Sequence, residues 1–164
     1  MSKVITATFK TREAAFNTIH KLEAAGIAEE QISVVVTDET RGRSFNIDEN
    51  TKADEGAAAG ATFGGIVGGV AAALAGAGTL VFPGLNLVVA GAVVSGLAGA
   101  GAGAATGGLI GLLIGAGIKE HEAKIYEDEL RSGAILLAVK AKDGEQKKMV
   151  EDILEHADSY NLAA

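Results

Sequence analysis

One uncharged stretch occupies the centre of this chain and limits what it can fold into. From Gly56 to Ile118, 63 consecutive residues carry no charged side chain, although 21% of the 164-residue sequence is charged. Glycine and alanine make up more than half of the stretch, and most of the rest is leucine, isoleucine, valine or phenylalanine. Exposed to water, such a segment would form a very large apolar patch, so it must be buried against something.

Small residues recur at every fourth position of this stretch, in two rows. Residues four apart share one face of a helix, and small side chains there let a second helix pack closely. The candidate helix-packing and oligomerisation residues are Gly56, Gly60, Gly64, Gly68 and Gly76 in the first row, and Gly91, Ser95, Gly99, Gly103, Gly107, Gly111 and Gly115 in the second.

Pro83 and Gly84 stand between the two rows and are the strongest turn signal in the stretch. They predict one helix over about 56–76, an apolar turn near 77–86, and a second helix from about 87. The two rows would then face each other in an antiparallel glycine-zipper hairpin. No breaker follows before Gly133, so the second helix is expected to continue past Ile118 to about residue 131.

The N-terminal arm, residues 1–37, has the pattern of a strand, a helix and a strand. Residues 3–10 alternate, with Ile5, Ala7 and Phe9 on one side and Val4, Thr6 and Thr8 on the other. Thr11 can cap a helix over 12–25 that ends at Gly26, and the β-branched run 32–37 predicts the second strand. Two strands joined in this way are expected to be parallel. The polar, charge-rich residues 38–55 are expected to form a linker.

The C-terminal arm, residues 119–164, completes the pattern after the helix continuation. A third strand is predicted over 134–141, and Asp143 can cap a helix over 144–157 with Gln146 in the capping-box position. The tail could add a short fourth strand. Together the arms predict an α+β fold: a split ferredoxin-like α/β sandwich with the helical hairpin, residues 56–118, inserted between its second and third strands.

Charge and residue types exclude several classes of function. The net charge is −7, and no basic cluster exceeds two neighbouring residues, so nucleic acid is not an expected partner. The absence of cysteine excludes disulfides, thiolate metal sites and cysteine nucleophiles. His20, His121 and His156 fall on separate predicted helices and are expected on solvated surfaces, and Tyr126 is expected to be a packing residue. We therefore expect no catalytic, cofactor or metal site, and a protein that is not an enzyme.

Three parts of the chain resemble a known family. They are the opening VITATFKTREAAFNTIHKLEAAGIAEEQISVVV, the central glycine-zipper block, and YEDELRSGAILLAVKA followed by an amphipathic helix. In this order they resemble the bacterial general-stress, or heat-induced stress, protein domains and related membrane-assigned domains of unknown function. The resemblance implies a stress-associated, non-enzymatic protein and brings no catalytic residues with it.

Three functions remain open from the sequence. The first is a stress-associated protein that self-assembles through its glycine-zipper helices and associates with membrane or lipid through the apolar hairpin. Both arms would then be cytoplasmic, because the N-terminus lacks the apolar region of a secretory signal. The alternative is a soluble cytoplasmic homo-oligomer whose apolar helices are buried between protomers. The third, by fold analogy alone, is a small-ligand sensor. The expected partners are copies of the chain itself and a membrane.

Overall fold

A sheet in the order β3-β4-β2-β5-β1-β6 runs through the part of the chain that the structure describes. The structure is a computed structural model, and it describes residues 4–37, 39–40, 79–82, 87–91, 110–111, 113–115, 118–157, 159 and 162–163. The strands are β1 (Val4–Phe9), β2 (Ile32–Thr37), β3 (Thr79–Phe82), β4 (Leu87–Gly91), β5 (Ile135–Lys140) and β6 (Leu162–Ala163). The helices are α1 (Arg12–Ala24), the 3-10 helix η1 (Glu29–Gln31), α7 (Glu120–Arg131) and α8 (Gly144–Glu155).

The predicted N-caps Thr11 and Asp143 begin α1 and α8, and the predicted stop at Gly26 follows α1. The side chain of Thr11 accepts a hydrogen bond from the backbone N–H of Ala14 at 3.2 Å, and Asp143 accepts one from Gln146 at 2.8 Å. These bonds satisfy backbone donors that the first turn of a helix leaves without partners. The chain leaves α1 through Gly26, whose φ of +83° suits glycine. The strands and helices predicted for the two arms are confirmed.

Strand β5 joins the two arms. It pairs antiparallel with β1 on one side and with β2 on the other, so β1 and β2 are parallel to each other. Five consecutive residues of β5, from Ile135 to Val139, are buried, as expected for a central strand covered on both faces. Strand β6 adds a short antiparallel pairing to the far side of β1. Helices and an antiparallel sheet thus confirm the α+β class.

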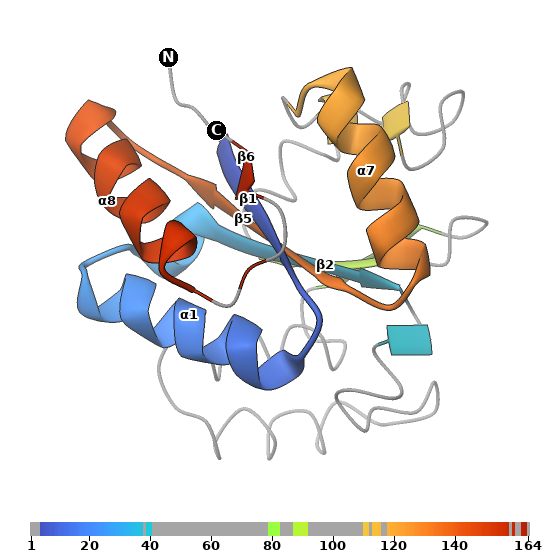
Figure 1. Cartoon of the computed structure of the whole chain (residues 1–164), viewed down its shortest axis with the longest axis horizontal. Coiled ribbons are helices and arrows are strands. Elements are labelled where there is room, and N and C mark those ends of the chain that lie inside the picture. Colours follow the sequence, from blue (N-terminus) through green and yellow to red (C-terminus); the bar gives the residue numbers. More distant parts are fainter. Residues whose placement is uncertain are drawn as a thin grey trace.

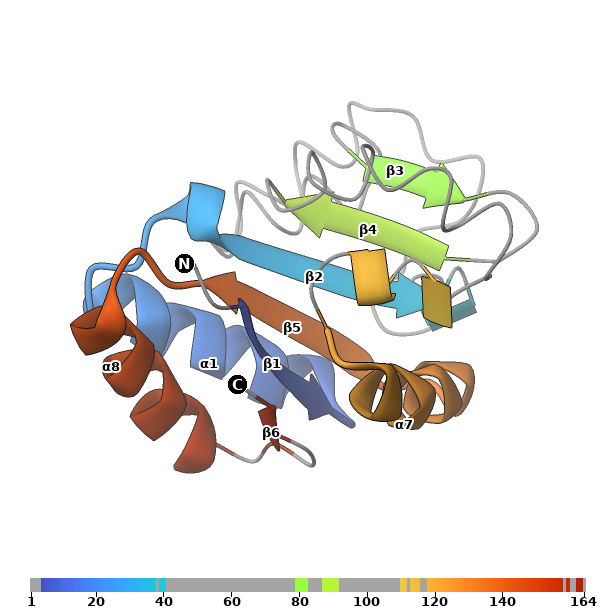
Figure 2. The same cartoon turned by 90° about the horizontal axis from the view of Figure 1, so that it is seen from above.

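The two faces of the sheet are covered by different helices (Figures 1 and 2). Helices α1 and α8 lie side by side on one face, where Ile5, Ala7 and Phe9 of β1 enter the main hydrophobic core. Helix α7 lies on the opposite face and buries Ala123, Tyr126 and Leu130, one residue per turn, against the sheet.

The middle of the uncharged stretch is strand rather than turn and helix. Residues 79–82 and 87–91 form β3 and β4, which pair with each other, and β4 also pairs with β2. The predicted apolar turn over 77–86 and helix from about 87 are therefore wrong at these positions. The physical reason lies in the local sequence, because TLVF and LVVAG are short runs of large and β-branched residues around a Pro-Gly signal, which favour a β-hairpin.

The predicted long helix is also interrupted before α7. Lys119 has extended backbone angles (φ −66°, ψ 145°) and forms the N-cap of α7. Just before it, the backbone N–H of Ile118 donates to the carbonyl of Leu113 at 3.0 Å, a bond typical of a helix end. Gly115 and Gly117 are a helix stop signal in the sequence, and the prediction of a continuous helix did not take it into account.

Other parts of the predicted hairpin lie outside the described residues. These are the first helix over 56–76, the turn residues Pro83 and Gly84, and residues 92–109 of the second helix. Nearly all of the separate polar linker over 38–55 also lies outside the described residues.

Val88 tests whether β4 belongs to the folded core. Its side chain is fully buried, and it lies opposite Val36 of β2. We expect Val88→Ala to lower the free energy of unfolding by about 2 kcal/mol, because two buried methyl groups are lost and a cavity remains. Urea unfolding of the full chain measures this change. Met149→Ala removes a 44% exposed side chain and should change stability by less than about 0.5 kcal/mol. Equal midpoints for the wild type and Val88→Ala would show that β4 does not contribute to the core.

Candidate functional site

Three of the predicted helix-packing positions lie within the described residues. Gly91 is in strand β4 opposite Ser33, so it is not part of a helical row. Gly111 and Gly115 are helical, and Gly115 is exposed beside Ile114, whose exposed fraction is 42%. The other nine positions lie outside the described residues, so the packing of the two rows stays a prediction.

The three histidines are exposed, as predicted. The ring Nδ1 of His156 lies 2.8 Å from the backbone carbonyl of Asp152, and this hydrogen bond, with the nearby Asp152 carboxylate, raises the pKa of His156. Within the described parts of the chain, no three histidine or acidic side chains are grouped so that they could hold a metal ion.

A buried polar site that the sequence analysis missed lies between β1 and α7. Thr6 and Thr8 point to the face of the sheet that α7 covers, and they are 2% and 0% exposed. Each is buried, because the side chains of β1 alternate between the two covered faces. Alternating polar residues predict a half-buried strand, in which the threonines would face solvent. The sequence therefore shows that two threonines share one side of β1, but not that a helix covers that side.

Tyr126 provides a partner for the first of these threonines. Its hydroxyl lies 2.9 Å from the Thr6 hydroxyl, and either group can donate the hydrogen bond. Burial of the phenol raises the pKa of Tyr126 to about 12, an effect that the bond to Thr6 partly offsets and the charges of Glu122 and Glu129 increase. Tyr126 is therefore a packing residue, as predicted, and also a hydrogen-bonding residue.

Thr8 lies two residues further along β1, where no tyrosine meets it. Its hydroxyl oxygen is buried and has no hydrogen-bond partner among the described residues. A buried hydroxyl without a partner costs about 1–3 kcal/mol, and native structures contain few such groups. Water or a ligand at this position would reduce that cost.

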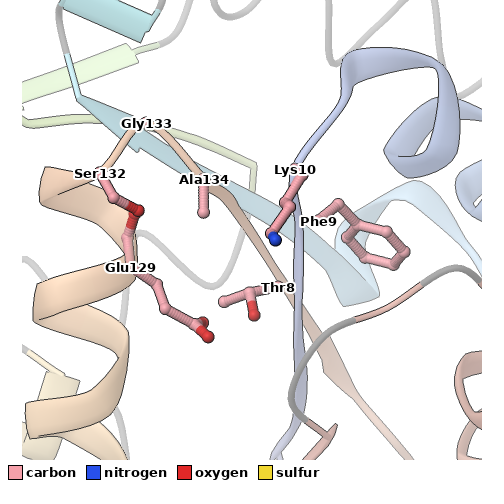
Figure 3. Close-up of a pocket in the computed structure, with 7 residues that line it drawn as sticks. All are labelled: Thr8, Phe9, Lys10, Glu129, Ser132, Gly133 and Ala134. Atoms are coloured by element: carbon pink, nitrogen blue, oxygen red, sulfur yellow. The ribbon is translucent and has the colours of Figure 1, made fainter.

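A pocket opens at Thr8, between the end of β1 and the turn from α7 to β5 (Figure 3). Its volume is about 300 Å³, at the small end of the range for ligand sites. The lining residues are Thr8, Phe9, Lys10, Glu129, Ser132, Gly133 and Ala134. The wall thus combines an ammonium group, a carboxylate and two hydroxyl groups with apolar carbon.

The turn from α7 to β5 gives one wall of the pocket its shape. The hydroxyl of Ser132 donates to the backbone carbonyl of Glu129 at 2.7 Å, and the backbone N–H of Ala134 donates to the same carbonyl at 3.0 Å. Gly133 has a φ of +99°, a conformation that costs glycine little. These bonds close the end of α7 and hold Glu129 at the edge of the pocket.

The Tyr126 hydroxyl predicts a pH-dependent stability. The folded-state pKa of about 12 exceeds the unfolded value of 10, so between these values the unfolded chain loses a proton that the folded chain keeps. The free energy of unfolding should therefore fall by about 2–3 kcal/mol as the pH rises through this window, whereas below the window the titration of Tyr126 causes no change with pH. Urea unfolding at a series of pH values measures the curve.

The matched variant for this prediction is Tyr126→Phe. At neutral pH it should be about 1–2 kcal/mol less stable than the wild type, because the Thr6 hydroxyl loses its partner. Above pH 10 the difference between the two proteins should shrink, since phenylalanine does not titrate. Parallel curves from pH 8 to 12 would contradict the assignment.

Comparison with known proteins places the chain in a family. No helix among the described residues has the length and apolar character needed to cross a membrane. No curated protein and no solved structure matches the sequence. The family pattern of the heat induced stress protein YflT domain matches residues 4–98, which include β1 to β4 and more than half of the chain. As the sequence resemblance predicted, the chain belongs to the heat induced stress protein YflT domain family, which points to a stress-associated role.

Proposed function

We propose that this protein is a non-enzymatic stress protein that assembles with copies of itself through two apolar segments, residues 56–78 and 92–118. The observation that carries the proposal is the pairing of β4 with β2. This pairing holds the middle of the uncharged stretch within the sheet and divides the remainder into two separate segments.

The pairing argues against a hairpin that spans a bilayer. Residues 56–78 lie between a polar segment that follows β2 and strand β3, which belongs to the same sheet. Residues 92–118 run from β4 back to α7, which packs on that sheet. Each segment must leave and return on one side, which takes about 40 apolar residues for a double crossing. The segments have 23 and 27 residues, which is too short for two crossings each. Burial between copies of the protein therefore fits both segments better than a transmembrane hairpin.

The apolar segments need a partner surface. Their alanine-rich sequence with a small residue, mostly glycine, at every fourth position is typical of helices that pack closely against other helices. At the end of the second segment, Ile114 is 42% exposed and lies next to the exposed Gly115 in the single chain. Contact with a second copy would remove such apolar surface from water.

We infer that the two arms form a ferredoxin-like frame for this assembly. The support is the strand order β2-β5-β1-β6, in which the parallel strands β1 and β2 are separated by β5, with α1 and α8 on one face. This is the order of a βαββαβ domain. The acidic arms would then lie outside the apolar contacts and keep the assembly dispersed.

Lipid contact is the second candidate function. The same uncharged segments could lie in a membrane surface without crossing it, as interfacial segments do. Flotation of the full chain with liposomes of neutral lipid separates the two candidates. Recovery of the protein with the floating lipid favours lipid contact, whereas a particle that stays at the bottom of the gradient favours assembly alone.

Gly107 and Gly111 test the self-assembly. The wild type, purified without detergent, should sediment as a homogeneous particle many times heavier than the 16.5 kDa chain. We expect Gly107→Leu with Gly111→Leu to reduce the particle mass severalfold or to cause heterogeneous aggregation, because leucine prevents close approach of helix backbones. Sedimentation velocity measures the mass distribution.

Gly144→Leu is the matched control for these substitutions. A side-chain carbon built at Gly144 meets nothing within 4 Å, so the same change of residue type has room there. The Gly144→Leu particle should have the mass of the wild type. A monomeric wild type, or an unchanged particle in the double variant, would overturn the proposal.

A further inference from the structure

We propose that the pocket between β1 and the turn from α7 to β5 binds a small zwitterion of the α-amino acid class. The site is formed by residues of the two arms and goes beyond the proposed self-assembly. Failure of one proposal therefore leaves the other standing.

The first step is the contrast between the two threonines of β1. Thr6 and Thr8 face the same helix and are equally buried, but only Thr6 meets a hydroxyl partner, Tyr126. The Thr8 hydroxyl is buried in the wall of the pocket without a partner among the described residues. A ligand in the pocket would supply the missing hydrogen bond, either as donor or as acceptor, because a hydroxyl can play both roles.

The second step is the pair of opposite charges. Lys10 and Glu129 line the pocket from different elements, and Figure 3 shows both side chains directed to the region around Thr8. A carboxylate of the ligand would accept hydrogen bonds from the Lys10 ammonium, and an ammonium of the ligand would donate to Glu129. Each of these residues also has other interactions, so the ligand would share their charges.

The end of helix α7 sets the orientation of the ligand. Glu129 and Ser132 lie at the C-terminal end of α7, where the helix dipole is negative and favours a cation. The ligand ammonium would therefore lie toward α7 and the ligand carboxylate toward Lys10. A pocket of about 300 Å³ has room for one such molecule with its side chain against the carbon atoms of Ala134.

The first experiment screens the standard L-α-amino acids against the full chain by thermal unfolding, followed by calorimetry of the best binder. We expect saturable binding with a dissociation constant in the millimolar range or lower. Two analogues of that binder, one without its α-ammonium and one without its α-carboxylate, should each bind at least about tenfold more weakly, because each loses a charge-assisted hydrogen bond.

Variants locate the binding. Thr8→Val keeps the shape of the side chain and removes the hydroxyl, and Glu129→Gln removes the charge. Each should weaken binding at least about tenfold while the chain stays folded. Glu120→Gln, on the exposed side of the same helix and paired with Lys124 at 3.0 Å, should bind like the wild type.

Two results would overturn the proposal. One is the absence of any shift in the unfolding midpoint with all of the amino acids at 10 mM, which would leave Lys10 and Glu129 as structural charges only. The other is binding that persists unchanged in both Thr8→Val and Glu129→Gln, which would place the binding elsewhere on the chain.

Discussion

The fold depends on the pairing of β5 with both β1 and β2. These strands come from opposite ends of the chain, and residues 38–134 separate β2 from β5. The entropic cost of closing a loop grows only with the logarithm of its length, so this loop costs about 3 kcal/mol more than a short hairpin loop. The buried apolar residues of β5 offset that cost, since burial of one such side chain is worth about 1.5–3 kcal/mol. A long insertion is therefore compatible with a stable sheet.

The insertion also contributes to the sheet that it interrupts. Strands β3 and β4 extend the sheet beyond β2, and the fully buried side chains of Val88 and Val89 lie in β4. The centre of the uncharged stretch therefore belongs to the sheet and to its buried core. Burial in the sheet thus explains the apolar character of residues 79–82 and 87–91, and for the uncharged segments on either side we propose burial between copies of the chain.

Coverage of both sheet faces creates the polar site. With α1 and α8 on one face and α7 on the other, every residue of β1 from Ile5 to Phe9 is buried, including two threonines. Hydroxyl groups buried in this way require partners. Tyr126 supplies a partner for Thr6. Thr8 instead lies at a pocket that Glu129 and the turn after α7 also line.

The sequence by itself determined the elements of the two arms, because Thr11, Gly26 and Asp143 act through bonds and backbone angles within a few residues. For residues 79–82 and 87–91 the runs of large and β-branched side chains favour strands locally, but only the tertiary structure shows that β4 pairs with β2 in the same sheet. The candidate site was hidden for the same reason. Thr8 and Glu129 are 121 positions apart in the chain, and only the packing of α7 on the second face of the sheet brings them to one pocket.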